Sequence, residues 1–271
     1  MSAIEAIVLG VVQGLTEFLP ISSSGHLRIV PAFLGWEDPG AAFTAVIQLG
    51  TMTAVLAYFR RDLWTIAQAW VRELRTPWRD HSHEAKLGWY ILLGTIPISI
   101  FGFVFADQIE SGARDLYLIG SALILFSLVM LAAEKLGTLR RGIESINARD
   151  GIAIGFAQAL ALIPGVSRSG ATISAGLLLD FDRAAAARYS FLLSVPAVVL
   201  SGLFELRHIG DPNGSSAGAT VIATIAAFVS GYVAIAWLLR YLASHTLGIF
   251  VAYRIPLGIA VLVLAATGAI S

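Results

Sequence analysis

The sequence contains no cysteine and few charged residues. Only 13% of its 271 residues are Asp, Glu, Lys or Arg, about half the share that is typical of soluble domains. The absence of cysteine excludes disulfides, thiolate metal sites and cysteine nucleophiles. The formal net charge is zero, so the charge balance predicts no nucleic-acid partner. The N-terminal stretch MSAIEAIVLG carries no basic residue and does not predict a cleavable signal peptide.

The chain is instead largely apolar. Hydrophobic residues make up 57% of it, and the mean hydropathy is +0.78. Six apolar runs are long enough to cross about 30 Å of hydrocarbon. They cover approximately residues 43–60, 86–106, 116–135, 184–206, 217–239 and 249–269. We therefore predict an all-α integral membrane protein, built as a single membrane domain over residues 1–271.

Two further apolar stretches are broken in the middle. Residues 2–34 are interrupted by Pro20 and a Ser-Ser-Ser-Gly run, and residues 151–180 by Pro164-Gly165 and a Ser-Arg-Ser-Gly run. Such residues interrupt the helical hydrogen bonds, and lipid cannot satisfy the backbone groups that are freed. We predict that each stretch is a re-entrant helical hairpin whose polar turn lies inside protein or a wet cavity.

The two broken stretches resemble each other. Residues 10–26 align with residues 155–171 at an offset of 145, which places Gln13 on Gln158 and Ser22 on Ser167. Three predicted spans separate the hairpins, so the hairpins enter the membrane from opposite faces. The sequence thus predicts two inverted repeats, about 1–140 and 141–271, the plan of many transporters with a site at the repeat interface.

The basic residues predict the orientation. One face carries most of them: Arg60, Arg61, Arg72, Arg75, Arg79, Lys86, Lys135, Arg140, Arg141, Arg149, Arg183 and Arg240. The other face has only Arg28, Arg114 and Arg207. We predict that the first face is cytoplasmic, so that both termini and the mouth of the first hairpin are on the outer face. Residues 61–85, with three tryptophans among the charges, predict an interfacial segment.

Polar groups at membrane depth are costly, and they indicate a functional site. A helix that starts at a Ser/Gly turn presents free N–H groups and its positive end, which suits a phosphate. Arg168 adds a fixed charge and a planar fork of donors. Glu17, serines 22–24 and His26 lie within ten residues, a grouping that suits an activated nucleophile. Gln13 and Glu17 share a helix face and suit a hard cation. Together these residues predict phosphoryl transfer at the membrane.

At these residues the chain resembles a known family. QGLTEFLPISSSGH (13–26) and PGVSRSGAT (164–172) are similar to the two signature segments of the bacterial undecaprenyl-diphosphate phosphatases, also called the bacitracin-resistance protein family. The resemblance extends to FTAVIQLGTMTAV (43–55), YSFLLSVPAV (189–198) and AYR (252–254), so it covers essentially the whole chain.

The resemblance implies an activity. The family hydrolyses undecaprenyl diphosphate to the monophosphate and inorganic phosphate at the outer leaflet of the bacterial plasma membrane, with a divalent cation such as Mg²⁺ or Ca²⁺. This reaction recycles the lipid carrier for peptidoglycan synthesis and gives bacitracin resistance. The expected partners are the polyprenyl diphosphate lipid and membrane lipids. The oligomeric state stays open, with a dimer among the options.

The resemblance also implies roles for individual residues. The catalytic residues would be Glu17, Ser23, His26 and Arg168. The residues that bind the substrate phosphates would be Ser22, Ser24, Gly25, Ser167, Ser169, Gly170 and Thr172. The metal ligands would be Glu17 and Gln13; many members have glutamate where this chain has Gln13, so Glu17 would carry the anionic charge alone.

Several alternatives stay open at this point. Ser23 attacks with His26 or Glu17 as the base, His26 is itself the nucleophile, or water attacks directly. A transporter or flippase for an anionic prenyl lipid fits inverted repeats equally well, although it needs no nucleophile. An intramembrane serine protease fits less well, because the chain has no GxSxG turn at these serines and Arg168 would have no use.

Some polar residues have no assigned role. Arg254, in the last predicted span, contacts either a phosphate or a carboxylate such as Glu134 or Glu205. Thr44 and Gln48 are candidates for the wall of the cavity, and Gln158 is expected to bridge the repeats.

Overall fold

The computed structural model describes residues 1–106, 108, 109, 115–205 and 217–270, with side chains except at 41, 42 and 201–205. Within these residues the chain is helical and forms no sheet. The helices are α1 (Ala3–Phe18), α2 (Ser23–Leu34), α3 (Gly40–Tyr58), α4 (Arg60–Glu73), α5 (His83–Val104), α7 (Leu116–Leu136), α8 (Ala148–Ala159), α9 (Arg168–Leu178), α10 (Arg183–Glu205), α11 (Ala217–Leu242) and α12 (Gly248–Ala266). Short 3₁₀ turns lie at Trp78–Asp80, Ile143–Ser145 and Leu160–Leu162.

The apolar helices identify a multi-pass membrane protein. Among the described residues, five helices are long and apolar enough to cross a membrane, namely α5, α7, α10, α11 and α12. The count reaches six if α3 and α4, which are bent by 72° at residue 59, form one span. Each of the six predicted runs coincides with a helix to within about three residues at either end, which confirms the all-α membrane class.

The two broken stretches are each a pair of short helices. α1 ends at Phe18 and α2 begins at Ser23, and α8 is separated from α9 by a 3₁₀ turn and the Pro164-Gly165 bend. Capping boxes start α1 at Ser2 and α8 at Asn147, because an acidic residue three positions on bonds the cap in return. The breaks therefore fall where the sequence predicts them.

Glycine allows the broken stretches to pack tightly on long helices. α1 lies against α11, and α8 lies against α5. A Cβ atom on Gly10 would lie 2.2 Å from the carbonyl oxygen of Ala223, and one on Gly155 would lie 2.4 Å from that of Gly94. Backbones come this close in membrane bundles only where side chains are absent or small. Gly10 and Gly155 are equivalent at the 145-residue offset.

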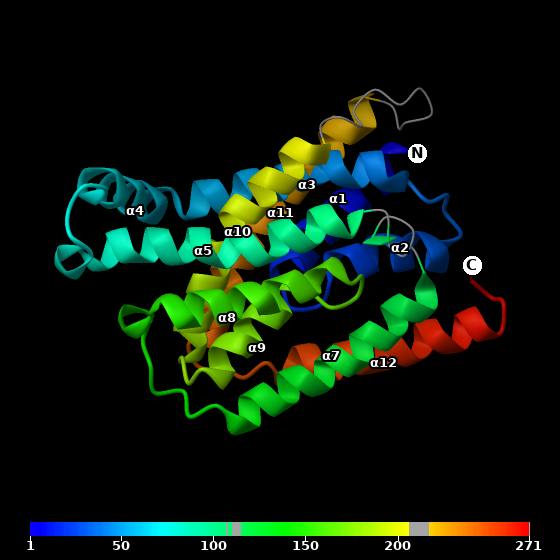
Figure 1. Ribbon diagram of the computed structural model, residues 1–271. Helices are drawn as coiled ribbons and strands as arrows, with labels where there is room; N and C mark the ends of the chain where they lie inside the picture. Colours follow the sequence, from blue (N-terminus) through cyan, green and yellow to red (C-terminus); the bar gives the residue numbers. More distant parts are fainter. Residues whose placement is uncertain (107, 110–114, 206–216, 271) are drawn as a thin grey trace.

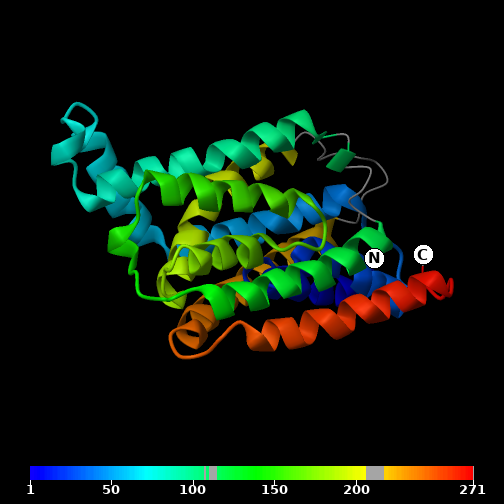
Figure 2. The ribbon, with the colours of Figure 1, turned by 60° about the horizontal axis from the view of Figure 1, so that its bottom comes forward.

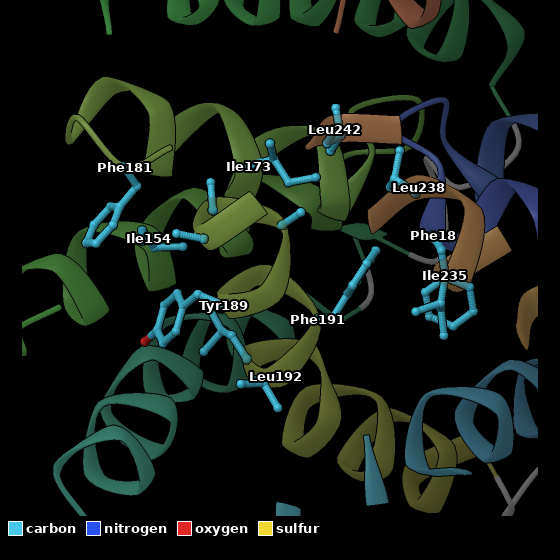
Figure 3. Packing of buried hydrophobic residues seen from close by; sticks show 14 of the residues in the cluster. Phe18, Ile154, Ile173, Phe181, Tyr189, Phe191, Leu192, Ile235, Leu238 and Leu242 are labelled. Carbon is cyan, nitrogen blue, oxygen red and sulfur yellow. The ribbon is translucent and has the colours of Figure 1, made fainter. Parts of the chain in front are cut away.

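A cluster of buried apolar residues joins the two halves of the chain. It takes side chains from α1, α8, α9, α10 and α11 (Figure 3). Phe18 of α1 packs edge-on against Phe191 of α10 at 5.7 Å between ring centroids. The Tyr189 hydroxyl donates to the carbonyl of Tyr90 at 3.1 Å, so the polar end of this buried ring is satisfied. The core thus positions the end of α1, where Glu17 lies, relative to α10.

The helices run roughly along one direction, with different polar features at the two ends. Both termini lie at one end of the bundle, and the arginine-rich α4 lies at the opposite end (Figures 1 and 2). Exposed tryptophans at 64 and 78 accompany α4 and the turn that follows it.

Gln158, on α8, is fully buried, and both polar atoms of its amide lack a hydrogen-bond partner. The expected bridge between the repeats is therefore absent from its described contacts. An unsatisfied buried amide costs about 1–3 kcal/mol. Since 1 kcal/mol shifts the Tm of a large domain by about 2–4 °C, we expect Gln158→Leu to raise the Tm of the purified protein by about 2–12 °C.

The control is Gln13→Leu, because the Gln13 amide donates to Glu17 at 3.2 Å. That variant should not raise the Tm. A lower Tm for Gln158→Leu would show that bound water satisfies the amide.

Candidate active site

A cavity of about 210 Å³ lies between the two broken stretches. Its polar lining comes from both of them. The first supplies Gln13, Glu17, Ser22, Ser23 and Ser24, and the second supplies Ser167 and Arg168. Thr44 and Gln48 of α3 complete the polar wall, and Leu27, Ile98, Ala161, Ala197 and Val198 line the rest. The lining of the cavity thus includes both polar and apolar side chains, as an amphiphilic ligand requires.

Glu17 joins the polar groups of this cavity. Its Oε1 accepts a hydrogen bond from Arg168 Nη2 at 2.5 Å, and its Oε2 accepts one from Ser23 Oγ at 2.6 Å. Gln13 Nε2 also donates to Oε2 at 3.2 Å. The Glu17 and Arg168 side chains are only 9% and 15% exposed, so the ion pair is largely shielded from solvent. This arrangement brings a hydroxyl, a carboxylate and a guanidinium together at one point.

Arg168 is held by α10 as well as by Glu17. Its Nη1 donates to the carbonyl of Ser194 at 3.4 Å. Thr172, one turn further along α9, donates to the Arg168 carbonyl at 2.8 Å and lies 2.5 Å from the Ser190 hydroxyl. Helix α10 therefore contacts the guanidinium through the Ser194 backbone and contacts the first turns of α9 through the Ser190 hydroxyl.

The two turns have the same backbone shape. Ser22 and Ser167 precede α2 and α9 with φ of 76° and 75°, a conformation that is uncommon outside glycine. Each hydroxyl accepts the N–H of the glycine three residues on, at 3.4 Å for Gly25 and 3.2 Å for Gly170. The strain of a positive φ persists only where surrounding contacts enforce it, commonly at functional sites.

His26 lies apart from the Glu17 group. Its Nδ1 is 2.7 Å from the Ser22 carbonyl, and its Nε2 is 2.7 Å from the Tyr253 hydroxyl. The two rings are also stacked, with 5.6 Å between centroids. Both ring nitrogens are thus engaged, and neither contacts Ser23 or Glu17. Sequence reasoning missed Tyr253, although it lies in the AYR segment that carries part of the family resemblance.

The other predicted site residues divide into two groups. Ser22, Ser24 and Ser167 line the cavity. Four residues lie outside its lining, namely Gly25, Ser169, Gly170 and Thr172. Arg254 contacts no carboxylate among the described residues, because Glu134 pairs with Arg183 at 2.6 Å instead. The Glu205 side chain, the other suggested partner, lies outside the described residues, as do Arg114 and Arg207.

Oxygen atoms at the cavity suit a hard divalent cation. The Oε1 of Gln13 is buried and has no hydrogen-bond partner, and it lies on the same residue whose amide nitrogen bonds Glu17. No group of three His, Asp or Glu with metal-binding geometry occurs in the described part of the chain. Mg²⁺ is commonly held by one or two protein oxygens together with substrate phosphates, and Glu17 with Gln13 fits that smaller set.

Comparisons with known proteins identify the family of this chain. The sequence matches the family described as bacitracin resistance protein BacA over residues 6–260. It is 55% identical to an undecaprenyl-diphosphatase of Nocardioides sp. over 99% of this chain and 98% of that protein. It is 53% identical to an undecaprenyl-diphosphatase of Mycobacterium sp., covering 100% and 99% of the two chains.

An undecaprenyl-diphosphatase 2 of Streptomyces avermitilis is 50% identical, over 100% of this chain and 97% of that protein. The matched range includes the polar turns of both broken stretches and all residues that line the cavity. The protein belongs to the bacitracin resistance protein BacA family.

Proposed function

We propose that this protein hydrolyses undecaprenyl diphosphate to undecaprenyl phosphate and inorganic phosphate. The observation that carries the proposal is the contact of Ser23 and Arg168 with the two oxygens of one carboxylate, Glu17. In the proposed reaction Ser23 is the nucleophile, Glu17 the base and Arg168 the phosphate clamp, and all three line the cavity. The apolar residues of its lining suit the first isoprene units of the lipid.

The proposed reaction begins when Arg168 turns from Glu17 to the terminal phosphate. Glu17 then accepts the proton of Ser23, whose Oγ forms a bond to the terminal phosphorus. The bond between that phosphorus and the bridging oxygen breaks, and undecaprenyl phosphate leaves with the electron pair and takes the proton from Glu17, which restores the carboxylate. Water then cleaves the phosphoserine with Glu17 as the base, which releases inorganic phosphate and restores the Ser23 proton. Most of the rate enhancement comes from positioning and charge stabilisation.

The geometry favours Glu17 over His26 as the base. Ser23 Oγ is 2.6 Å from Glu17, whereas both nitrogens of His26 are engaged by Ser22 and Tyr253. The same contacts disfavour His26 as the nucleophile. The Ser23–Glu17 contact also favours an enzyme over a carrier for an anionic prenyl lipid, because a carrier needs Arg168 but no activated hydroxyl.

A divalent cation, Mg²⁺ or Ca²⁺, would bind Glu17 and the free Oε1 of Gln13. When bound, it would neutralise negative charge on the diphosphate. Arg168 performs the same task from the other broken stretch, so the two positive groups flank the substrate.

We further propose that the chain is an inverted repeat with two re-entrant hairpins. The packing of the helices supports this, because each broken stretch lies against a long helix of the opposite half. α1 of the first half packs on α11, and α8 of the second half packs on α5. The matching turns at Ser22 and Ser167 support it as well. In the proposed orientation the end that carries both termini is the outer face, and the arginine-rich α4 lies at the cytoplasmic surface (Figure 1).

Phosphate release tests the activity and the cation together. We expect the purified protein to release inorganic phosphate from a C55 prenyl diphosphate in Mg²⁺ or Ca²⁺ buffer. EDTA should lower the rate by at least about tenfold, since cations contribute several kcal/mol to charge stabilisation. A prenyl monophosphate is the matched control, and it should release none. No release in the presence of either cation would overturn the enzymatic proposal.

Reporter fusions test the orientation. A reporter that is active only outside the cytoplasm should be active when fused to either terminus, and inactive when inserted after Leu74 at the end of α4. Activity at the α4 position with none at the termini would reverse the proposed orientation.

A further inference from the structure

Arg254, on α12, is fully buried. An arginine at this depth of a membrane protein is costly and is normally paired with a carboxylate or used directly in function. Here the described contacts include no carboxylate, and Arg254 does not line the cavity. Its burial is therefore explained neither by an ion pair nor by contact with the substrate.

The Arg254 guanidinium bonds oxygen atoms on three elements. On α7, Nε donates to the Ser127 hydroxyl at 3.1 Å. At the first turn, Nη1 donates to the Pro20 carbonyl at 3.1 Å. At the second turn, Nη2 donates to the carbonyls of Gly165 and Val166 at 3.0 and 3.2 Å. One side chain therefore satisfies backbone oxygens that both breaks release, in a region where lipid offers no donor.

The two turns are held at equivalent points. Pro20 and Gly165 are separated by the same 145 residues that relate Ser22 to Ser167. The turns also lie close together, since a Cβ added to Gly25 would lie 3.8 Å from the Gly165 Cα. The planar fork of arginine donors can reach both carbonyls at once, whereas a lysine ammonium presents a single point.

The held carbonyls are close in sequence to the proposed catalytic groups. Pro20 lies three residues after Glu17 and three before Ser23, and Gly165 lies three before Arg168. A shift of either turn would therefore move Glu17 and Ser23 relative to Arg168. The neighbouring Tyr253 acts on the first turn too, through its hydrogen bond to His26.

We propose that Arg254 is a positioning residue that locks the two turns together and so sets the alignment of Ser23 and Glu17 with Arg168. It acts through the backbone carbonyls of Pro20 and Gly165, without touching the substrate. The inference about alignment rests on the structure alone, and its kinetic consequence rests on the proposed function.

The absence of cysteine makes a distance measurement direct. Spin labels at Leu15→Cys, in the last turn of α1, and Ile163→Cys, at the second break, occupy sites that are 37% and 43% exposed. We expect the distances between the two labels to form one narrow distribution in the otherwise unchanged protein. Arg254→Gln should broaden it and lower kcat by about 100-fold, the effect of a misplacement of about 1 Å, while KM changes less than kcat. Arg254→Lys should also broaden it, since its ammonium cannot hold both turns.

Arg188→Gln is the matched control, because Arg188 is an exposed arginine on α10 that pairs with Asp62. It should change neither the distances nor kcat. A narrow distribution in Arg254→Gln, with or without loss of kcat, would overturn the positioning role.

If Arg254→Gln does not fold, Ser127→Ala provides the test instead. This variant removes one hydrogen-bond acceptor of the Arg254 guanidinium and should broaden the distance distribution slightly. An unchanged distribution would overturn the proposal. Failure of phosphate release in the unsubstituted protein would leave the distance result intact, so the two proposals fail separately.

Discussion

Arg168→Ala is expected to lower kcat for phosphate release by about 10³-fold, within the range seen when an arginine that stabilises a transferring phosphoryl group is lost. Arg168 is the only Lys or Arg among the described residues that line the cavity. Without it, the developing charge on the phosphate would meet Glu17 with no fixed positive group beside it. Arg168→Lys should recover only part of the rate, because an ammonium cannot replace the planar fork that reaches Glu17 and the Ser194 carbonyl.

Folding must be separated from catalysis in this experiment. Removing one partner of a buried ion pair costs about 3–5 kcal/mol, so the Tm of Arg168→Ala should be measured beside its kcat. Arg188→Ala serves as the control for loss of an arginine, since its pair with Asp62 is partly exposed and worth at most about 1 kcal/mol. Full activity in a folded Arg168→Ala would remove the phosphate clamp from the mechanism.

Ser23→Ala is expected to lower kcat by about 10³-fold or more, as the loss of a nucleophile does in other hydrolases. Ser24→Ala is the matched comparison, since Ser24 lines the same cavity and, within the described part of the chain, its hydroxyl bonds only that of Ser22, at 3.3 Å. Loss of one neutral hydrogen bond is worth about 1 kcal/mol, so Ser24→Ala should lower kcat by about tenfold or less. Equal losses at the two serines would argue against Ser23 as the nucleophile.

Trapping experiments identify the attacking atom. With substrate labelled at the terminal phosphate, rapid quenching should leave an acid-stable adduct on the protein, which Ser23→Ala abolishes. An acid-labile adduct would assign the attack to histidine, contrary to the contacts of His26. No adduct at any time, with full phosphate release, would indicate direct attack by water, and Glu17 would then act on that water.

The helices and the breaks were predictable because both depend on local chemistry. The run at residues 116–135 is long enough to span a membrane wherever it lies in the fold, and it is α7, Leu116–Leu136. Pro20 and Pro164-Gly165 end helices through steric and hydrogen-bonding effects within a few residues. The similarity at an offset of 145 residues was apparent from the sequence. In the structure the equivalent residues Ser22 and Ser167 have nearly equal φ angles.

The contacts within the site were less predictable. Glu17 and Arg168 meet although 151 residues separate them, and the choice between Glu17 and His26 as the base could not be made from their positions beside Ser23. In the structure α2 turns His26 toward Tyr253, which is 227 residues away in sequence, whereas Ser23 contacts Glu17. The family resemblance named these residues without indicating which side chain contacts which.

Arg254 illustrates most clearly the difference between what the sequence predicts and what the tertiary structure decides. Composition, hydrophobic length and the chemistry of Pro, Ser and Gly are properties of short segments, so membrane class, helix positions and the two polar turns followed from them. The partners of a buried arginine depend on how distant helices pack, and only the tertiary structure placed its donors on the carbonyls of Pro20 and Gly165 rather than on a phosphate or a carboxylate. A guanidinium can satisfy several acceptors at once, and which acceptors surround it is decided by the whole bundle.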